Sequence, residues 1–177
     1  HLVSGYRFHG TLNGGSGVLI PAHSAVFHKF GFRFGRGGTH TRRTLMLAEL
    51  SALLNYVGNR SATKGDYRHA VVKDNCLGKR SSANREMTFK YLRELYALDP
   101  GEVLFRSLLF FWDRDEAGRP LLALLCAYAR DAILRSSAPF VLAIDQGDQL
   151  EKDLFEQYID SLEPGRYSET TLGCCQS

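Results

Sequence analysis

The sequence has no long apolar run and few cysteines. Its longest apolar stretch, Pro120 to Ala129, is far shorter than the roughly 20 residues of a membrane-spanning helix, and the charged Arg130 and Asp131 follow at once. The four cysteines contain no C-x-x-C pair, so neither a zinc site nor a small disulfide framework is predicted. With 177 residues, of which 44% are hydrophobic and 23% charged, the chain is expected to be a globular cytoplasmic protein with reduced thiols and no membrane partner.

The residue patterns of common enzymes are also missing. His69 and Cys76 lie seven positions apart, but the signatures that surround a Cys-His nucleophile are absent. The run from Asn13 to Gly17 is glycine-rich, yet it lacks the Lys-Ser/Thr pair and the glycine spacing of a phosphate-binding loop. Four histidines lack the spacing of metal ligands: His9, His23, His28 and His40. We therefore expect no catalytic residue, metal, cofactor or small-molecule substrate.

The stretch from Lys64 to Leu98 is typical of two helices joined by a tight turn. Thr63 and Asp66 fit a capping box at the start of the first helix. Asp74-Asn75-Cys76-Leu77-Gly78 contains poor helix formers and a glycine suited to positive φ, which predicts the turn. Ser81 or Ser82 then caps a second helix. Its apolar residues at three- and four-residue spacing are expected to face a core: Met87, Tyr91, Leu92 and Leu95. The opposite face carries Asn84, Arg85, Thr88 and Lys90.

Charge is distributed unevenly along the chain. From Arg60 to Arg93 there are nine lysines and arginines and three acids, a net charge of +6, whereas Gly101 to Glu163 carry six cations and twelve acids, a net charge of −6. Cations and hydroxyls gather at the start of the second helix, where such groups contact phosphates and where Arg and Asn read base edges. The candidate DNA contacts are Lys64, Arg68, Lys73, Lys79, Arg80, Ser81, Ser82, Asn84, Arg85 and Lys90. The alternative is that this basic face contacts only solvent. Helix pairs with short turns also occur in proteins that bind no nucleic acid.

Three parts are expected along the chain. Residues 1 to 38 form a basic arm rich in glycine and aromatic residues and without an acid. Residues 39 to 98 form a helix-turn-helix-like DNA-binding lobe, and residues 99 to 177 form an acidic helical lobe. Ser168, followed by Glu169, predicts the start of one more helix. Either a short terminal helix follows, or the natural protein continues beyond Ser177.

Caps and apolar spacing predict the remaining helices. Thr39 or Thr41 caps a helix that runs to Val57, and Asp99-Pro100-Gly101-Glu102 has the residues of a helix start, with Trp112 near the end of that helix. A helix from Pro120 to Leu134 is apolar around nearly its whole circumference, which predicts central burial. Asp148 with Glu151 caps a helix through Leu162. The helix that ends at Val57 is expected to bury one face, made of Leu45, Met46, Leu50, Leu53, Leu54 and Val57.

Several of these features occur in a recognisable order. A Gly37-Gly38-Thr39 start is followed by VVKDNCLGKRSSANREMTFKYLRELYAL, whose core is Asn75, Leu77, Lys79, Arg80 and Ser82. In this order they resemble the BrxA family, small DNA-binding proteins of bacteriophage exclusion (BREX) defence systems. The resemblance covers about residues 37 to 177 and is specific around 71 to 98. It implies an all-α protein with winged-helix or helix-turn-helix-like lobes, which binds double-stranded DNA without catalysis and works beside other phage-defence subunits.

Two hypotheses remain for the function. The first is a non-enzymatic DNA-binding module, in which the candidate residues above face the duplex. The second is a protein-protein interaction adaptor, whose basic lobe docks an acidic partner and whose acidic lobe, with the helix Asp148 to Leu162, docks a basic one. The salt dependence of binding to random-sequence duplex separates the two.

Overall fold

The structure is a computed structural model that describes residues 24–33, 45–58, 61–162 and 164, and these residues form eight helices and no strand. In chain order the helices are α1 (Ser24–Lys29), α2 (Leu47–Val57), α3 (Lys64–Val72), α4 (Ser82–Tyr96), α5 (Val103–Trp112), α6 (Arg119–Arg130), α7 (Ala132–Leu142) and α8 (Lys152–Leu162). The all-α prediction is confirmed, and the described ranges contain no strand of a wing. In the same ranges no helix is both long and apolar enough to cross a membrane.

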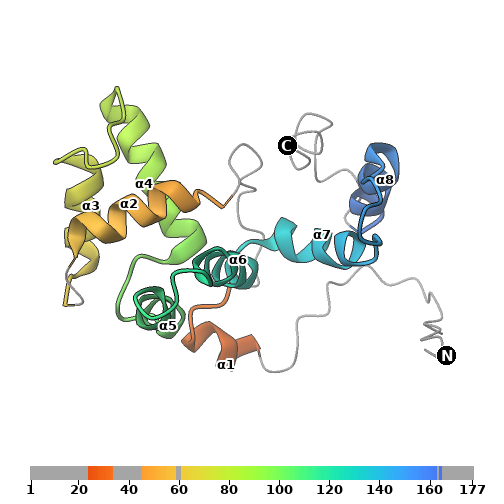
Figure 1. The fold of residues 1–177 in the computed structure, drawn as a ribbon, viewed down its shortest axis with the longest axis horizontal. Coiled ribbons are helices and arrows are strands. Elements are labelled where there is room, and N and C mark those ends of the chain that lie inside the picture. Colours follow the sequence, from red (N-terminus) through yellow and green to blue (C-terminus); the bar gives the residue numbers. More distant parts are fainter. Residues whose placement is uncertain (1–23, 34–44, 59–60, 163, 165–177) are drawn as a thin grey trace.

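The helices are arranged as an elongated series, which Figure 1 shows from one end to the other. α2, α3 and α4 lie at one end, α5 and α6 lie in the middle, and α7 and α8 lie at the other end. α3 packs against α2 and α4, and α5 packs against α6. α6 also contacts α4 and α7, so it joins the two ends of the molecule.

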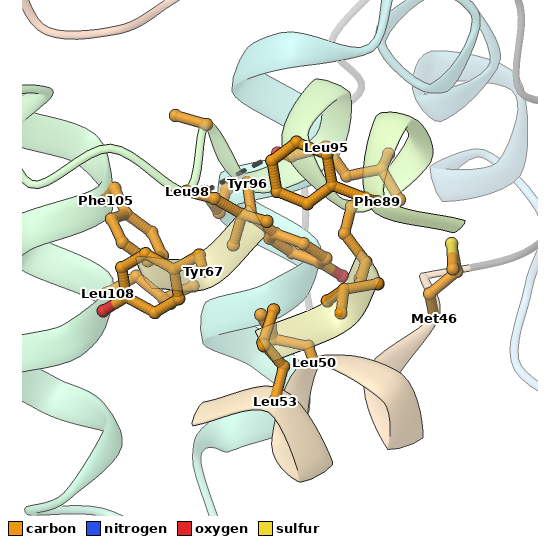
Figure 2. Close-up of a cluster of buried hydrophobic side chains, with 14 of the residues drawn as sticks. Met46, Leu50, Leu53, Tyr67, Phe89, Leu95, Tyr96, Leu98, Phe105 and Leu108 are labelled. Atoms are coloured by element: carbon orange, nitrogen blue, oxygen red, sulfur yellow. Dashed lines mark hydrogen bonds between the residues drawn. The ribbon is translucent and has the colours of Figure 1, made fainter. Parts of the chain in front are cut away.

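One hydrophobic core joins α2 to α6, and it runs from Met46 to Ala127 across the boundary expected at residues 98 and 99. Figure 2 shows Leu50 and Leu53 of α2 facing the side chains that α3 and α4 contribute to this core. The ring of Tyr67 meets the ring of Phe105 edge-on, with the centroids 5.4 Å apart. Aromatic pairs of this geometry add to the stabilisation that burial provides. We call helices α2 to α6 the body.

A second, much smaller cluster lies between α7 and α8, which we call the hairpin. Phe155 and Ile159 of α8 are buried there, and Phe140, Leu150 and Tyr158 pack against them. The ring of Phe140 contacts the rings of both Phe155 and Tyr158.

The starts of the predicted helices are partly confirmed. Thr63 caps α3 and forms the predicted capping box with Asp66, whose side chain accepts the Thr63 N–H at 2.7 Å. α2 begins only at Leu47, because Leu45 and Met46 are not helical and Met46 has a φ of 47°. The predicted caps Thr39 and Thr41 lie outside the described residues. α5 begins at Val103, since the Asp99 carboxylate accepts the Gly101 N–H and holds Asp99–Glu102 in a turn instead.

The single helix predicted from Pro120 to Leu134 is wrong in two respects. Asp131 has an extended backbone and accepts the Leu134 N–H at 2.9 Å, so it ends α6 and caps a separate helix, α7. Central burial is also wrong for the described chain. One side of α6 is buried through Ala123, Cys126, Ala127 and Ala129, but its other side is exposed. α8 ends at Leu162 as predicted, and Ser168 lies outside the described residues.

Candidate nucleic-acid interface

The turn between α3 and α4 is built by Asn75 and Gly78, which both have positive φ (54° and 61°). A non-glycine side chain at positive φ is strained, and Asn and Gly are the residues that tolerate it best. The Asn75 side-chain oxygen accepts the Lys79 N–H at 2.8 Å, and the Cys76 N–H donates to the Ala70 carbonyl at 3.0 Å. The predicted turn is therefore confirmed, and it leads the chain directly into α4.

Ser81 caps α4 and settles the choice between the two serines. Its hydroxyl oxygen accepts the Asn84 N–H at 3.1 Å, and its own backbone is extended. Ser82 is the first residue of the helix and is exposed. The other backbone N–H groups in the first turn of α4 have no partner within the helix, as at any helix N-terminus.

The face of α4 that meets the core differs from the predicted one. Thr88 and Phe89 are buried (0% and 4% exposed), together with Leu92, Leu95 and Tyr96, whereas Met87 is 44% exposed and Tyr91 is half-buried. The observed core face shares Leu92 and Leu95 with the predicted one, and it adds Phe89 and Tyr96. The observed one buries the large rings of Phe89 and Tyr96, and a larger apolar area removed from water stabilises the fold more. The predictions that Met87 faces the core and that Thr88 faces away from it are wrong.

The outward face of α4 consequently has its own residue set. Ala83, Glu86, Met87 and Lys90 are exposed on it. Asn84 and Arg85 are half-buried, and the Arg85 Nε atom is buried without a hydrogen-bond partner in the described parts of the chain. Met87 is the residue of this face that sequence reasoning missed, because its apolar character assigned it to the core.

Three of the ten candidate contacts are held by carboxylates of the same chain. The Lys64 Nζ lies 3.3 Å from Asp99, and an Arg68 guanidinium nitrogen lies 2.5 Å from Glu86. Lys79 donates to Glu49 of α2 at 3.1 Å, and both side chains are largely shielded from solvent. Because Glu49 lies thirty positions before Lys79, no local sequence pattern could have predicted this pair.

Three other cations are exposed and have no carboxylate partner among the described residues: Lys73, Arg80 and Lys90. Lys73 caps the C-terminal end of α3, Arg80 directly precedes the Ser81 cap, and Lys90 lies on the outward face of α4. We call these three the free cations. They all belong to the unit formed by α3, the turn and α4.

The two cysteines of the described chain, Cys76 in the turn and Cys126 on α6, both have a raised thiol pKa. Burial and the neighbouring Asp74 raise the pKa of the Cys76 thiol, and burial raises the pKa of the Cys126 thiol to about 12. His69 and Tyr56 both contact Asp74, at 3.2 Å each, and this carboxylate raises the pKa of the Tyr56 hydroxyl. A thiol with a raised pKa is a poor nucleophile at neutral pH. In the described ranges no three His, Cys, Asp or Glu side chains gather in a way that could hold a metal ion.

No family model matches the chain, and no curated protein or solved structure is significantly similar to it.

Proposed function

We propose that this chain binds double-stranded DNA, without catalysing a reaction, through α3, the turn and the first half of α4. The observation that carries the proposal is the set of free cations, Lys73, Arg80 and Lys90, on a pair of helices joined by a tight turn. Cations that already bind a carboxylate of their own chain gain less from a phosphate, so the free cations are the strongest candidates for phosphate contacts.

The position of each free cation supports this assignment. Arg80 directly precedes Ser81 and Ser82, at the end of α4 where unpaired N–H groups and the helix dipole favour an anion. Lys90 lies about two turns further along the exposed face, and Lys73 ends the preceding helix. Residues in these places flank the groove when a helix-turn-helix unit docks its second helix. Ser82 and Asn84 remain candidates for contacts, while Arg85 is less accessible than the sequence predicted.

The internal ion pairs lower the expected salt dependence. If only the free cations release counterions, the logarithm of the binding constant falls with the logarithm of salt concentration at a slope of about −3. Phosphate contacts by all seven candidate lysines and arginines are not expected, because three of them are neutralised by carboxylates of the same chain: Lys64 by Asp99, Arg68 by Glu86 and Lys79 by Glu49. Binding without sequence preference is then micromolar or weaker at physiological salt.

Fluorescence anisotropy with a labelled random-sequence duplex, repeated over a series of salt concentrations, tests the proposal. The triple variant Lys73→Ala, Arg80→Ala, Lys90→Ala is expected to lose most of the affinity and the salt slope. The matched control Lys29→Ala, Arg106→Ala, Lys152→Ala removes the same charge from other helices and is expected to bind like the parent. Failure of the parent to bind duplex at low salt, or equal losses in both triple variants, would refute the proposed interface.

A protein-protein adaptor is the second candidate, and the acidic hairpin favours it. Five exposed acids lie in or beside α7 and α8: Asp145, Asp148, Glu151, Asp153 and Asp160. The exposed Lys152 of α8 is paired with another carboxylate, that of Glu156. A lysine-rich peptide that binds the parent, but not the variant Asp148→Asn, Glu151→Gln, Asp153→Asn, would support this function. The wider proposal of an accessory, cytoplasmic role in phage defence beside other defence subunits rests on the sequence resemblance alone.

A further inference from the structure

The outward face of α4 contains an apolar pair between two cations. Ala83 and Met87 lie four positions apart, so they follow one another along the same side of the helix, and both are exposed, Met87 to 44%. We call these two residues the apolar pair. Lys90 continues the row three positions further on, and Arg80 lies just before the Ser81 cap. Along the chain, one free cation therefore precedes the apolar pair and another follows it.

The polar side chains in the same two turns are less exposed or already bound. Asn84 and Arg85 are half-buried, and the Arg85 Nε atom is buried. The Glu86 carboxylate is exposed, but it binds Arg68 of α3 at 2.5 Å. Arg and Asn read guanine and adenine through paired hydrogen bonds, which require an accessible planar group. The outward face of α4 therefore presents apolar atoms at positions where base-reading helices commonly carry hydrogen-bonding groups.

The charge around the apolar pair selects the partner. Arg80 and Lys90 are free cations, and cations attract a polyanion. A partner that meets this face must present anionic groups to the cations and apolar groups to the pair at the same time. The major groove of double-stranded DNA admits an α-helix between two rows of phosphates, and the 5-methyl group of thymine is the apolar group on the base edges inside it.

We propose that Ala83 and Met87 contact the 5-methyl groups of thymines in the major groove, and that Met87 sets a base preference. The inference rests on the proposed function, because α4 must lie in the groove for this contact to form. The unbranched, flexible methionine side chain can adjust to methyl groups at different positions. The phosphate contacts of the free cations carry no sequence information, so the preference for thymine comes from the apolar pair.

Fluorescence anisotropy with two A·T-rich duplexes of identical sequence tests this contact. One duplex contains thymine, and the other contains deoxyuracil at every thymine position, which removes only the 5-methyl groups. The parent is expected to bind the thymine duplex about fourfold more tightly for each methyl group that is buried. Met87→Ala is expected to lose most of this difference. Met87→Leu keeps a large apolar side chain and is expected to retain it.

Salt dependence separates the apolar contact from the phosphate contacts. An apolar contact releases no counterion, so Met87→Ala should weaken binding to the thymine duplex at the salt slope of the parent. Lys90→Ala should instead lower the slope by about 0.9 and keep the preference for thymine. The control Leu154→Ala truncates a leucine of similar exposure (50%) on α8 and is expected to match the parent in both measurements. Circular dichroism checks that each variant is folded.

The possible outcomes distinguish this inference from the proposed function. Equal affinity of the parent for the two duplexes, with a clear salt slope, would overturn the thymine contact and leave the proposed function standing. A full thymine preference in Met87→Ala would place the methyl contact on other residues and would also overturn the inference. An acidic peptide with apolar residues offers the same two kinds of group as the groove. Failure of the parent to bind either duplex at low salt would favour such a partner, and would overturn the proposed function together with this inference.

Discussion

The body and the hairpin bury their apolar residues to very different extents. In the body, side chains from five helices share one cluster, and Leu50, Leu53, Leu92 and Phe105 are all 0% exposed. In the hairpin, Phe155 and Ile159 are the buried centre, and Leu142 is 83% exposed. Because stability follows the apolar area removed from water, the body should fold as one cooperative unit, while the hairpin should open at a lower free energy.

Charge follows the same division. The α3–α4 unit holds the free cations, and the hairpin with its connecting turn carries five exposed acids: Asp145, Asp148, Glu151, Asp153 and Asp160. The basic surface is thus placed on rigid, well-packed helices, whereas the acidic surface belongs to a helix pair that contacts the rest of the described chain mainly through α6. A surface on rigid helices presents its side chains at fixed spacing, which duplex recognition requires. The predictions below test both halves of this comparison.

The largest effect is expected for a truncation in the body. Leu95 is 5% exposed and lies where α4 packs on α6, so Leu95→Ala removes buried methyl groups and leaves a cavity. We expect the free energy of unfolding to fall by about 2 to 5 kcal/mol. Urea denaturation followed by circular dichroism measures it. Tyr56→Ala, which truncates a side chain that is 56% exposed on α2, is the control, and a comparable loss there would argue against the burial pattern of α4.

A smaller global effect is expected for the equivalent truncation in the hairpin. Ile159 is 0% exposed, yet Ile159→Ala should lower the free energy of global unfolding by less than about 1 kcal/mol, because the loss is limited by the hairpin's own stability. Amide hydrogen exchange should report it as lost protection in α7 and α8 with the body unchanged. The exposed Leu154→Ala serves as control. A shift of the whole unfolding curve by Ile159→Ala would mean that the hairpin and the body unfold together.

Local signals in the sequence predicted the helices well where a cap and a turn agree. Thr63 with Asp66, and Ser81 after the Asn75–Gly78 turn, define α3 and α4 almost to the residue. Prediction was weaker where the outcome depends on tertiary contacts. Which face of α4 is buried depends on the rings of Phe89 and Tyr96, which the core accepts in place of Met87. The break between α6 and α7 depends on Asp131, whose side chain caps α7 at the point where α6 ends. The ion pairs between Lys79 and Glu49 and between Arg68 and Glu86 join residues 30 and 18 positions apart, so only the fold could place them.

The smallest effect, and the sharpest test of the basic surface, is expected for Glu86→Gln. Glu86 binds Arg68 at 2.5 Å, and both side chains are about half exposed. Since exposed ion pairs contribute little, the unfolding free energy should change by less than about 1 kcal/mol. The released Arg68 becomes one more cation for phosphate, so duplex affinity should rise and the salt slope should steepen by about 0.9. Asp153→Asn removes an equal charge from α8 as the matched control. If both variants bind duplex equally well and with the same slope, the gain reflects total charge, and Arg68 does not lie at the interface.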